Sequence, residues 1–188
     1  MESIKHVGYT QPDRQAAEDA AIAAVQADPE NYRAIFEGQL SRPAPSIAKI
    51  GDALGAGAKV EIVAVHALPE SALENTLLRF QGYGRGASIH VIAQIQGGLA
   101  DGLLEIRRHF GDTVVLRIAD YRDRKRSVLL VGWNHLDVLR SEGTYEIIKQ
   151  RLSDALEARR PLIGEAAYRQ AKGLAPLDAD TDSSDLQR

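Results

Sequence analysis

The sequence contains no cysteine in its 188 residues. Disulfides, thiolate metal sites, iron–sulfur clusters and cysteine nucleophiles are therefore excluded together. The absence of cysteine suits the cytosol, where stable disulfides are rare, and the Ala- and Arg-rich composition suggests a bacterial protein. We therefore expect a cytoplasmic protein of a bacterium.

Aromatic side chains are also scarce, and the chain has no excess of positive charge. Aromatic residues make up 5% of the chain, so its core must consist mainly of Leu, Ile, Val and Ala. The net charge is −3, whereas a protein that coats nucleic acid is usually strongly basic, because neutralised phosphates supply most of its affinity. No run approaches the ~18 apolar residues of a membrane span. We therefore expect neither a nucleic-acid nor a membrane partner.

Composition divides the chain into three parts. Residues 1–42 contain two segments with helix signals, one behind a capping box at residues 10–13 and one that begins at Asp28 and Pro29. Residues 43–173 carry the regular apolar patterns of a folded α/β domain. Residues 174–188 lose their apolar residues and gain four aspartates, so we expect a disordered acidic tail there.

The predicted domain begins with a short helix and continues in the order β-α-β-α-β-β-α. The strands are predicted at residues 59–68, 87–95, 112–121 and 127–133, and the helices between and after them at 69–80, 97–111 and 144–161. Two β-α-β units imply parallel crossovers, while the link of residues 122–126 is too short for a crossover and predicts an antiparallel hairpin. We therefore expect an α/β fold with a mixed, mostly parallel sheet; a two-layer α+β fold is the alternative.

Glycines occur at two predicted boundaries between elements. The boundaries differ in whether a strand or a helix comes before the glycines. A dinucleotide fingerprint places its glycines behind a strand and at the start of a helix, where free N–H groups face the phosphates. In residues 79–91, RFQGYGRGASIHV, the order is reversed, because a helix ends near Gln81 and a strand begins near Ala87. Gly82 is therefore predicted to end a helix rather than to bind a ligand.

Gln96, Gly97 and Gly98 form the better candidate for an anion-binding site. They follow a predicted strand and precede a predicted helix, which is the order that binding of an anion at a helix N-terminus requires. Asp101 lies in the first turn of that helix and would repel an anion, and glycine is also common in ordinary turns of this kind. The sequence leaves both interpretations open.

His66 and Asp120 are the candidate catalytic residues. Each ends a predicted strand, so both are expected at the same edge of the sheet as Gln96. A histidine beside a carboxylate could exchange protons with a substrate held by the glycine turn. The alternative is a histidine satisfied by local hydrogen bonds. We expect no metal site and no cofactor.

Basic residues gather at the tip of the predicted hairpin. Arg122, Arg124, Lys125 and Arg126 are candidates for binding an acidic protein partner. The alternative is a solvated run of charge that prevents strand edges from aggregating.

Residues 118–133, IADYRDRKRSVLLVGW, resemble a segment of the YopJ-like effector acetyltransferases, and the resemblance extends to residue 160. Those proteins have a papain-like core, with a strand carrying Asp-Tyr-Arg, a short turn, a Ser before an apolar strand, and then a helix. The resemblance places the catalytic His of the family at Val115 and its acidic partner at Gly132, and no cysteine corresponds to the nucleophile. It implies a secreted effector or a relative without the catalytic residues of the family.

The absence of a strong catalytic motif favours a protein that acts by binding. We expect a non-catalytic interaction protein of the bacterial cytosol, acting through a protein partner or through self-association. One alternative is a small-molecule or phosphate-ester enzyme, with an anionic ligand bound at the carboxyl ends of the parallel strands. The other alternative is the effector implied by the resemblance.

Overall fold

The computed structural model describes residues 38–123 and 125–175, together with residues 16, 17, 19, 20, 23, 24, 27, 28 and 35. Those described between residues 16 and 27 are helical, as predicted, whereas Ile35, in the second predicted helix, is not. Gly38, Gln39 and Leu40, at the end of that second predicted helix, are not helical either. The other residues of the two N-terminal predictions, almost all of the predicted acidic tail, and Arg124 lie outside the described residues.

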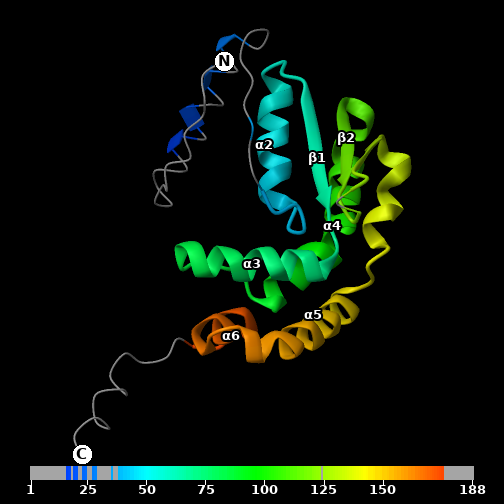
Figure 1. The fold of residues 1–188 in the computed structure, drawn as a ribbon. Coiled ribbons are helices and arrows are strands. Elements are labelled where there is room, and N and C mark those ends of the chain that lie inside the picture. Colours follow the sequence, from blue (N-terminus) through cyan, green and yellow to red (C-terminus); the bar gives the residue numbers. More distant parts are fainter. Residues whose placement is uncertain are drawn as a thin grey trace, which may run out of the picture.

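The described chain is mostly helical, with one small sheet (Figure 1). In chain order the elements are α2 (Ala44–Gly55), β1 (Val60–His66), α3 (Pro69–Tyr83), α4 (Ile89–Phe110), η1 (Gly111–Thr113), β2 (Val114–Asp120), β3 (Val128–Val131), η2 (Trp133–Arg140), α5 (Tyr145–Arg159), η3 (Arg160–Leu162) and α6 (Glu165–Lys172). Here α and β denote α-helices and strands, and η denotes 3-10 helices.

The sheet has the strand order β1-β2-β3 and is mixed. β1 and β2 are parallel over their full length, from Val60 opposite Val114 to His66 opposite Asp120. β2 and β3 are antiparallel, which confirms the predicted hairpin. The prediction of a mostly parallel sheet of four strands is wrong, because the sheet has one parallel pair, one antiparallel pair and no strand at residues 87–95.

Residues 87–95 are the main error of the sequence prediction. Ser88 caps α4, its Oγ accepting a hydrogen bond from the Val91 N–H at 3.4 Å, and the helix runs from Ile89 without interruption to Phe110. Ile89, Ile92 and Ala93 are all buried, which is helical spacing. The boundary before this helix is also shifted, because α3 ends at Tyr83 and the left-handed residue that ends it is Gly84, not Gly82.

Two apolar clusters form the core, and α4 belongs to both. The first lies between the inner face of the sheet, α2, the second half of α4 and η2, and includes Leu103, Ile106, Leu116 and Ile118. The second lies among α3, α5, α6 and the first half of α4. In Figure 1, α3, α5 and α6 lie together at one end of the sheet, so the carboxyl ends of β1 and β2 meet the helical half of the molecule.

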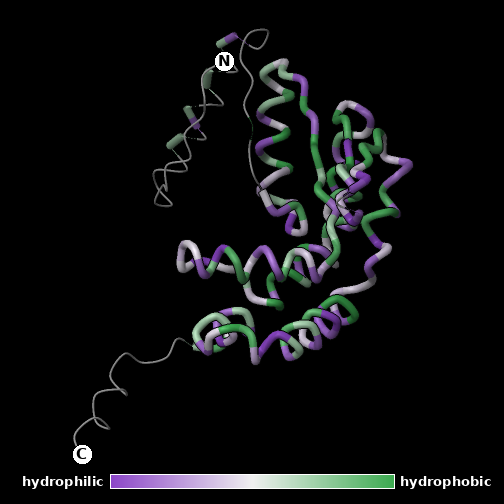
Figure 2. Tube along the Cα trace, viewed as in Figure 1, coloured by the Kyte–Doolittle hydropathy of each residue, from purple (hydrophilic) through white to green (hydrophobic). Residues whose placement is uncertain are grey.

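The opposite face of the sheet is not covered by any helix that the structure describes. Val63, Val65, Val115, Leu129 and Val131 point outward from it and are 43% to 61% exposed. The strand register places Glu61, Arg117 and Ala119 among them. We call these eight residues the open face. Figure 2 shows that apolar residues continue along β1.

Candidate functional site

The parallel pairing of β1 and β2 brings His66 and Asp120 together. They are register partners at the carboxyl ends of the two strands, and His66 Nδ1 lies 3.8 Å from Asp120 Oδ1. This distance is too long for a hydrogen bond. The structure therefore places the two predicted catalytic residues side by side without joining them directly.

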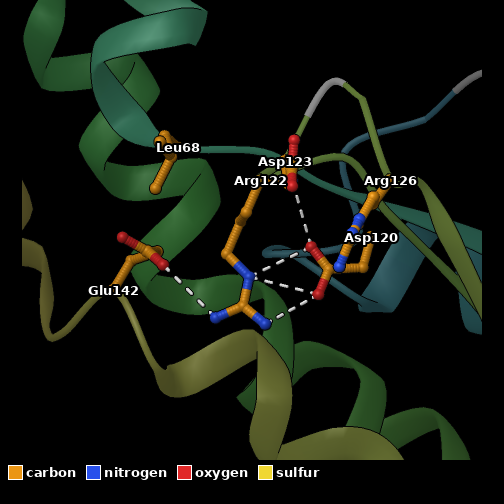
Figure 3. Close-up of a pocket in the computed structure, with 6 residues that line it drawn as sticks. All are labelled: Leu68, Asp120, Arg122, Asp123, Arg126 and Glu142. Atoms are coloured by element: carbon orange, nitrogen blue, oxygen red, sulfur yellow. Dashed lines mark hydrogen bonds and ion pairs between the residues drawn. The ribbon is translucent and has the colours of Figure 1, made fainter.

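The carboxylate of Asp120 binds Arg122 instead of His66. The Arg122 Nε and Nη2 donate to the two Asp120 oxygens at 2.7 to 3.1 Å (Figure 3). The Arg122 Nη1 donates to Ser141 Oγ at 2.9 Å. These hydrogen bonds from Arg122 hold the pKa of Asp120 below its ordinary value. Asp120 is therefore an ionised carboxylate with its acceptor positions largely used.

Glu142 is the site residue that sequence reasoning missed. It lies in the loop between η2 and α5, its side chain is only 10% exposed, and its Oε1 lies 3.7 Å from Arg122 Nη1 and 3.9 Å from His66 Nε2. Its other oxygen accepts a hydrogen bond from Arg151 at 2.9 Å. A single glutamate in a loop belongs to no periodic pattern, so the sequence carries no signal for it.

The charges continue into the helical half of the molecule. Arg151 on α5 donates two hydrogen bonds of 2.9 Å to the carboxylate of Glu70 in the first turn of α3. Burial acts to raise the pKa of Glu70, but hydrogen bonds from Arg151 and from its own backbone lower it below the ordinary value. We call this chain of alternating charges the ionic network: Asp120, Arg122, Glu142, Arg151 and Glu70. It connects the sheet and its hairpin to α3 and α5.

His66 itself is sealed. It is 5% exposed, and neither ring nitrogen has a hydrogen-bond partner among the described residues. Burial, followed by the positive charge of Arg122, lowers the pKa of His66, although Asp120 and Glu142 act to raise it. A cavity of about 20 Å³ lies beside the ring, bordered also by Gln96 and Glu142; it can hold one water molecule. The histidine is therefore neutral at pH 7 and closed to a substrate.

The predicted anion-binding turn at Gln96, Gly97 and Gly98 is wrong. All three lie inside α4, where their backbone N–H groups belong to the helix. Gln96 does reach the His66 cavity, with its Nε2 donating to the Ala67 carbonyl at 3.2 Å. Gly97 and Gly98 instead provide close packing, Gly97 against the backbone of Tyr145 and Gly98 against Ser41.

A larger pocket of about 440 Å³ lies on the other side of the ionic network (Figure 3). Its lining residues are Leu68, Asp120, Arg122, Asp123, Arg126 and Glu142. Arg122 is already matched by Asp120 and Glu142, and Arg126 has no ion-pair partner among the described residues. One free arginine beside three carboxylates gives the pocket no strong preference for an anion.

The predicted partner-binding group at the hairpin tip is divided. Arg122 turns inward and forms part of the ionic network, so it is not available to a partner. Lys125 and Arg126 remain exposed, and Arg124 lies outside the described residues. For Arg124, Lys125 and Arg126, binding to an acidic partner therefore stays a prediction.

Val115 and Gly132, the two positions to which the predicted resemblance would assign the catalytic residues of the YopJ-like proteins, lie close together in the hairpin. The Gly132 N–H donates to the Leu116 carbonyl at 2.8 Å, and Val115 precedes Leu116 on β2. Gly132 has a φ of +107°, which favours glycine, and Val115 lies on the open face. Neither side chain can exchange a proton.

Neither a metal cluster nor a membrane-spanning helix occurs in the described part of the chain. No group of three or more His, Cys, Asp or Glu residues is arranged to hold a metal ion within residues 38–123 and 125–175 or the described N-terminal positions. No helix among the described residues is both long enough and apolar enough to cross a membrane.

The fold and site define a mixed α/β protein whose sheet is joined to a helical half by a partly buried ionic network. No protein-family model matches this chain, and comparison with curated proteins gives no significant match.

His66 is expected to make stability depend on pH. Its pKa in the folded protein lies below the ordinary value of 6.5, so as the pH falls below about 6.5 the unfolded chain binds a proton that the folded protein does not. The free energy of unfolding should fall in this range by at most about 1.4 kcal/mol per pH unit. Glu70 and Asp120 contribute only at lower pH, because their ordinary values are 4.5 and 3.8.

Urea titrations between pH 8 and 5 would measure this dependence. His66→Gln should remove most of it, whereas His135→Gln, in η2 and away from the network, should leave it in place. Equal pH dependence in the wild type and His66→Gln would show that His66 is not the group responsible.

Proposed function

We propose that this protein acts by binding another protein, not by catalysis, and that the open face of the sheet is the binding surface. The observation that carries the proposal is the set of five aliphatic side chains on one sheet face that are 43% to 61% exposed. The cysteine-free sequence supports a cytosolic setting for this binding. The proposed partner is a protein surface that is itself aliphatic and carries little net charge.

The bare face is unusual for strands of this kind. A parallel pair such as β1 and β2 normally has both faces covered, because its crossover helices pack on the sheet. Here the inner face of β1 and β2 packs against the core, whereas the outer face has no helix on it among the described elements. Contiguous exposed apolar surface on a folded protein usually marks an interaction site.

The charges on the open face support an apolar partner. Glu61 and Arg117 are its only charged residues, and they pair with each other at 2.8 Å between Oε2 and Nε. The face therefore has no net charge. Such a surface gains most from burial against aliphatic groups, since each Å² of apolar area removed from water contributes about 25 cal/mol.

The enzyme alternative has less support. A general base must come within about 2.6–3.2 Å of the atom whose proton it removes, but His66 is 5% exposed and does not line the larger pocket. Asp120 is held by Arg122. Asp120 belongs to the ionic network that joins two parts of the fold, and His66 is enclosed behind it.

Site-specific photo-crosslinking tests the proposal. A benzoylphenylalanine in place of Val65, on the open face, should form a discrete adduct in the native cytosol. The same residue in place of Leu162, which is 82% exposed in η3, serves as the control and should form none.

The adduct partner, identified by mass spectrometry, is then purified and titrated against the wild type and Val65→Asp. Binding that Val65→Asp weakens at least tenfold supports the proposal. Adducts of equal yield at the two positions, or binding unchanged by Val65→Asp, would contradict it.

A further inference from the structure

We infer that the protein that covers the open face is a second copy of this chain, packed face to face about a two-fold axis. This inference rests on the proposed function and names its partner. It is carried by the arrangement of charge and shape on the face, since an isologous interface requires a surface that is complementary to itself.

The ion pair of the open face is self-complementary. Glu61 lies on the edge strand β1 and Arg117 on the central strand β2, and their side chains are 43% and 38% exposed. A two-fold rotation that places two such faces together can bring Glu61 of each copy to Arg117 of the other. The four charges then alternate in sign, so neither copy buries an unmatched charge.

The shape of the face fits the same operation. The register places Val63, Arg117 and Val131 in one row across the sheet, and Val65, Ala119 and Leu129 in the next. In the second row the small Ala119 stands between the larger Val65 and Leu129. Two sheets packed face to face interdigitate their side chains about 10 Å apart, so larger side chains from the outer strands of one copy can pack over Ala119 of the other.

The size of the face predicts a weak dimer. Strands lie about 4.8 Å apart and rise about 3.4 Å per residue, so three strands and four residues of each give a footprint of roughly 200 Å². A stable interface buries about 800 Å² on each partner. The association should therefore depend on concentration, with a dissociation constant in the micromolar range.

Sedimentation velocity of the full chain between about 5 and 500 µM tests the inference. The wild type should shift from monomer towards dimer across this range. Glu61→Arg and Arg117→Glu alone should each weaken dimerisation at least tenfold, because each places like charges against one another. An equimolar mixture of the two variants should restore a heterodimer, because the two arginines on the open face of one variant then meet the two carboxylates of the other.

Glu105→Arg is the matched control, because Glu105 is exposed on α4 and also pairs with an arginine. This charge reversal should leave the dimer unchanged. Circular dichroism and thermal melts of every variant distinguish loss of association from loss of folding.

Other results would overturn the inference in distinguishable ways. A monomer at 500 µM whose Val65 position crosslinks to a different protein removes the second copy and leaves the proposed function standing. A monomer whose Val65 position crosslinks only to residues 1–37 of its own chain removes both, and so does a monomer with no adduct. A dimer that both charge reversals leave intact places the interface elsewhere, as in pairing through the edge of β3.

Discussion

Replacing Gly97 by alanine is expected to lower the free energy of unfolding by about 2 kcal/mol, although alanine favours a helix by about 1 kcal/mol over glycine. A Cβ at this position would lie 2.7 Å from the Tyr145 backbone nitrogen and 2.9 Å from its Cα. These atoms form the start of α5, so the clash can be relieved only by separating α4 from α5. The loss should therefore exceed the gain in helix propensity.

Gly82→Ala is the matched control and should have the opposite sign. Gly82 lies inside α3, and a Cβ there would meet no atom within 4 Å. The substitution should stabilise the protein by about 0.5 to 1 kcal/mol, because alanine loses less conformational freedom on folding. Thermal melts resolve the difference, since about 1 kcal/mol corresponds to roughly 2–4 °C in a chain of this size. An unchanged or raised melting temperature for Gly97→Ala would contradict the close contact of α4 with α5.

Residues 87–95, in the first part of the helix that contains Gly97, show why one element could not be predicted from the sequence. Residues 87–95 satisfy two periods at once: Ile89, Val91, Ala93 and Ile95 alternate as in a strand, while Ile89, Ile92 and Ala93 have helical spacing. The choice is made by burial against α3, α5 and α6, which are distant in sequence. Tertiary packing of this kind commonly overrides β propensity.

The hairpin and the remaining strands were predictable because their signals are local. A five-residue link fixes β2 and β3 as antiparallel, and β-branched runs mark β1 and β2. The placement of His66 and Asp120 at one edge of the sheet was predictable, because each ends a predicted strand, whereas their pairing in register comes from the structure. Glu142 and Arg151 were not predictable as site residues, because only the folded chain brings them to the ends of those strands.

The sequence indicates that both sides of β1 are apolar, but not which side is left without a covering helix. β1 is apolar on both sides, with Ile62 and Ala64 on one and Val63 and Val65 on the other. Such a strand is normally buried on both faces, so the pattern indicates that something covers the outer side. The structure adds that none of the described helices does so. The intermolecular contact proposed above would satisfy this pattern.

Glu142→Gln is expected to lower the free energy of unfolding by about 2 kcal/mol. The side chain is 10% exposed and connects two arginines, with Arg151 at 2.9 Å and Arg122 at 3.7 Å. Removing one member of a buried ion pair costs about 3–5 kcal/mol, because the remaining charge loses its partner without regaining water. The cost should be smaller here, since both arginines are 34% exposed and keep Asp120 and Glu70 as partners.

Glu105→Gln separates this buried network from an ordinary surface pair. Glu105 also contacts an arginine and a histidine, Arg108 at 3.1 Å and His109 at 3.5 Å, but its side chain is 41% exposed. Exposed pairs contribute about 0–1 kcal/mol, so this variant should change the free energy of unfolding by less than about 0.5 kcal/mol. Urea titrations at pH 7.5, where His66 is neutral, compare the two substitutions at low and high salt. Added salt should remove what little Glu105 contributes and leave most of the effect of Glu142. Equal effects of the two substitutions would mean that the ionic network does not hold the sheet to the helical half.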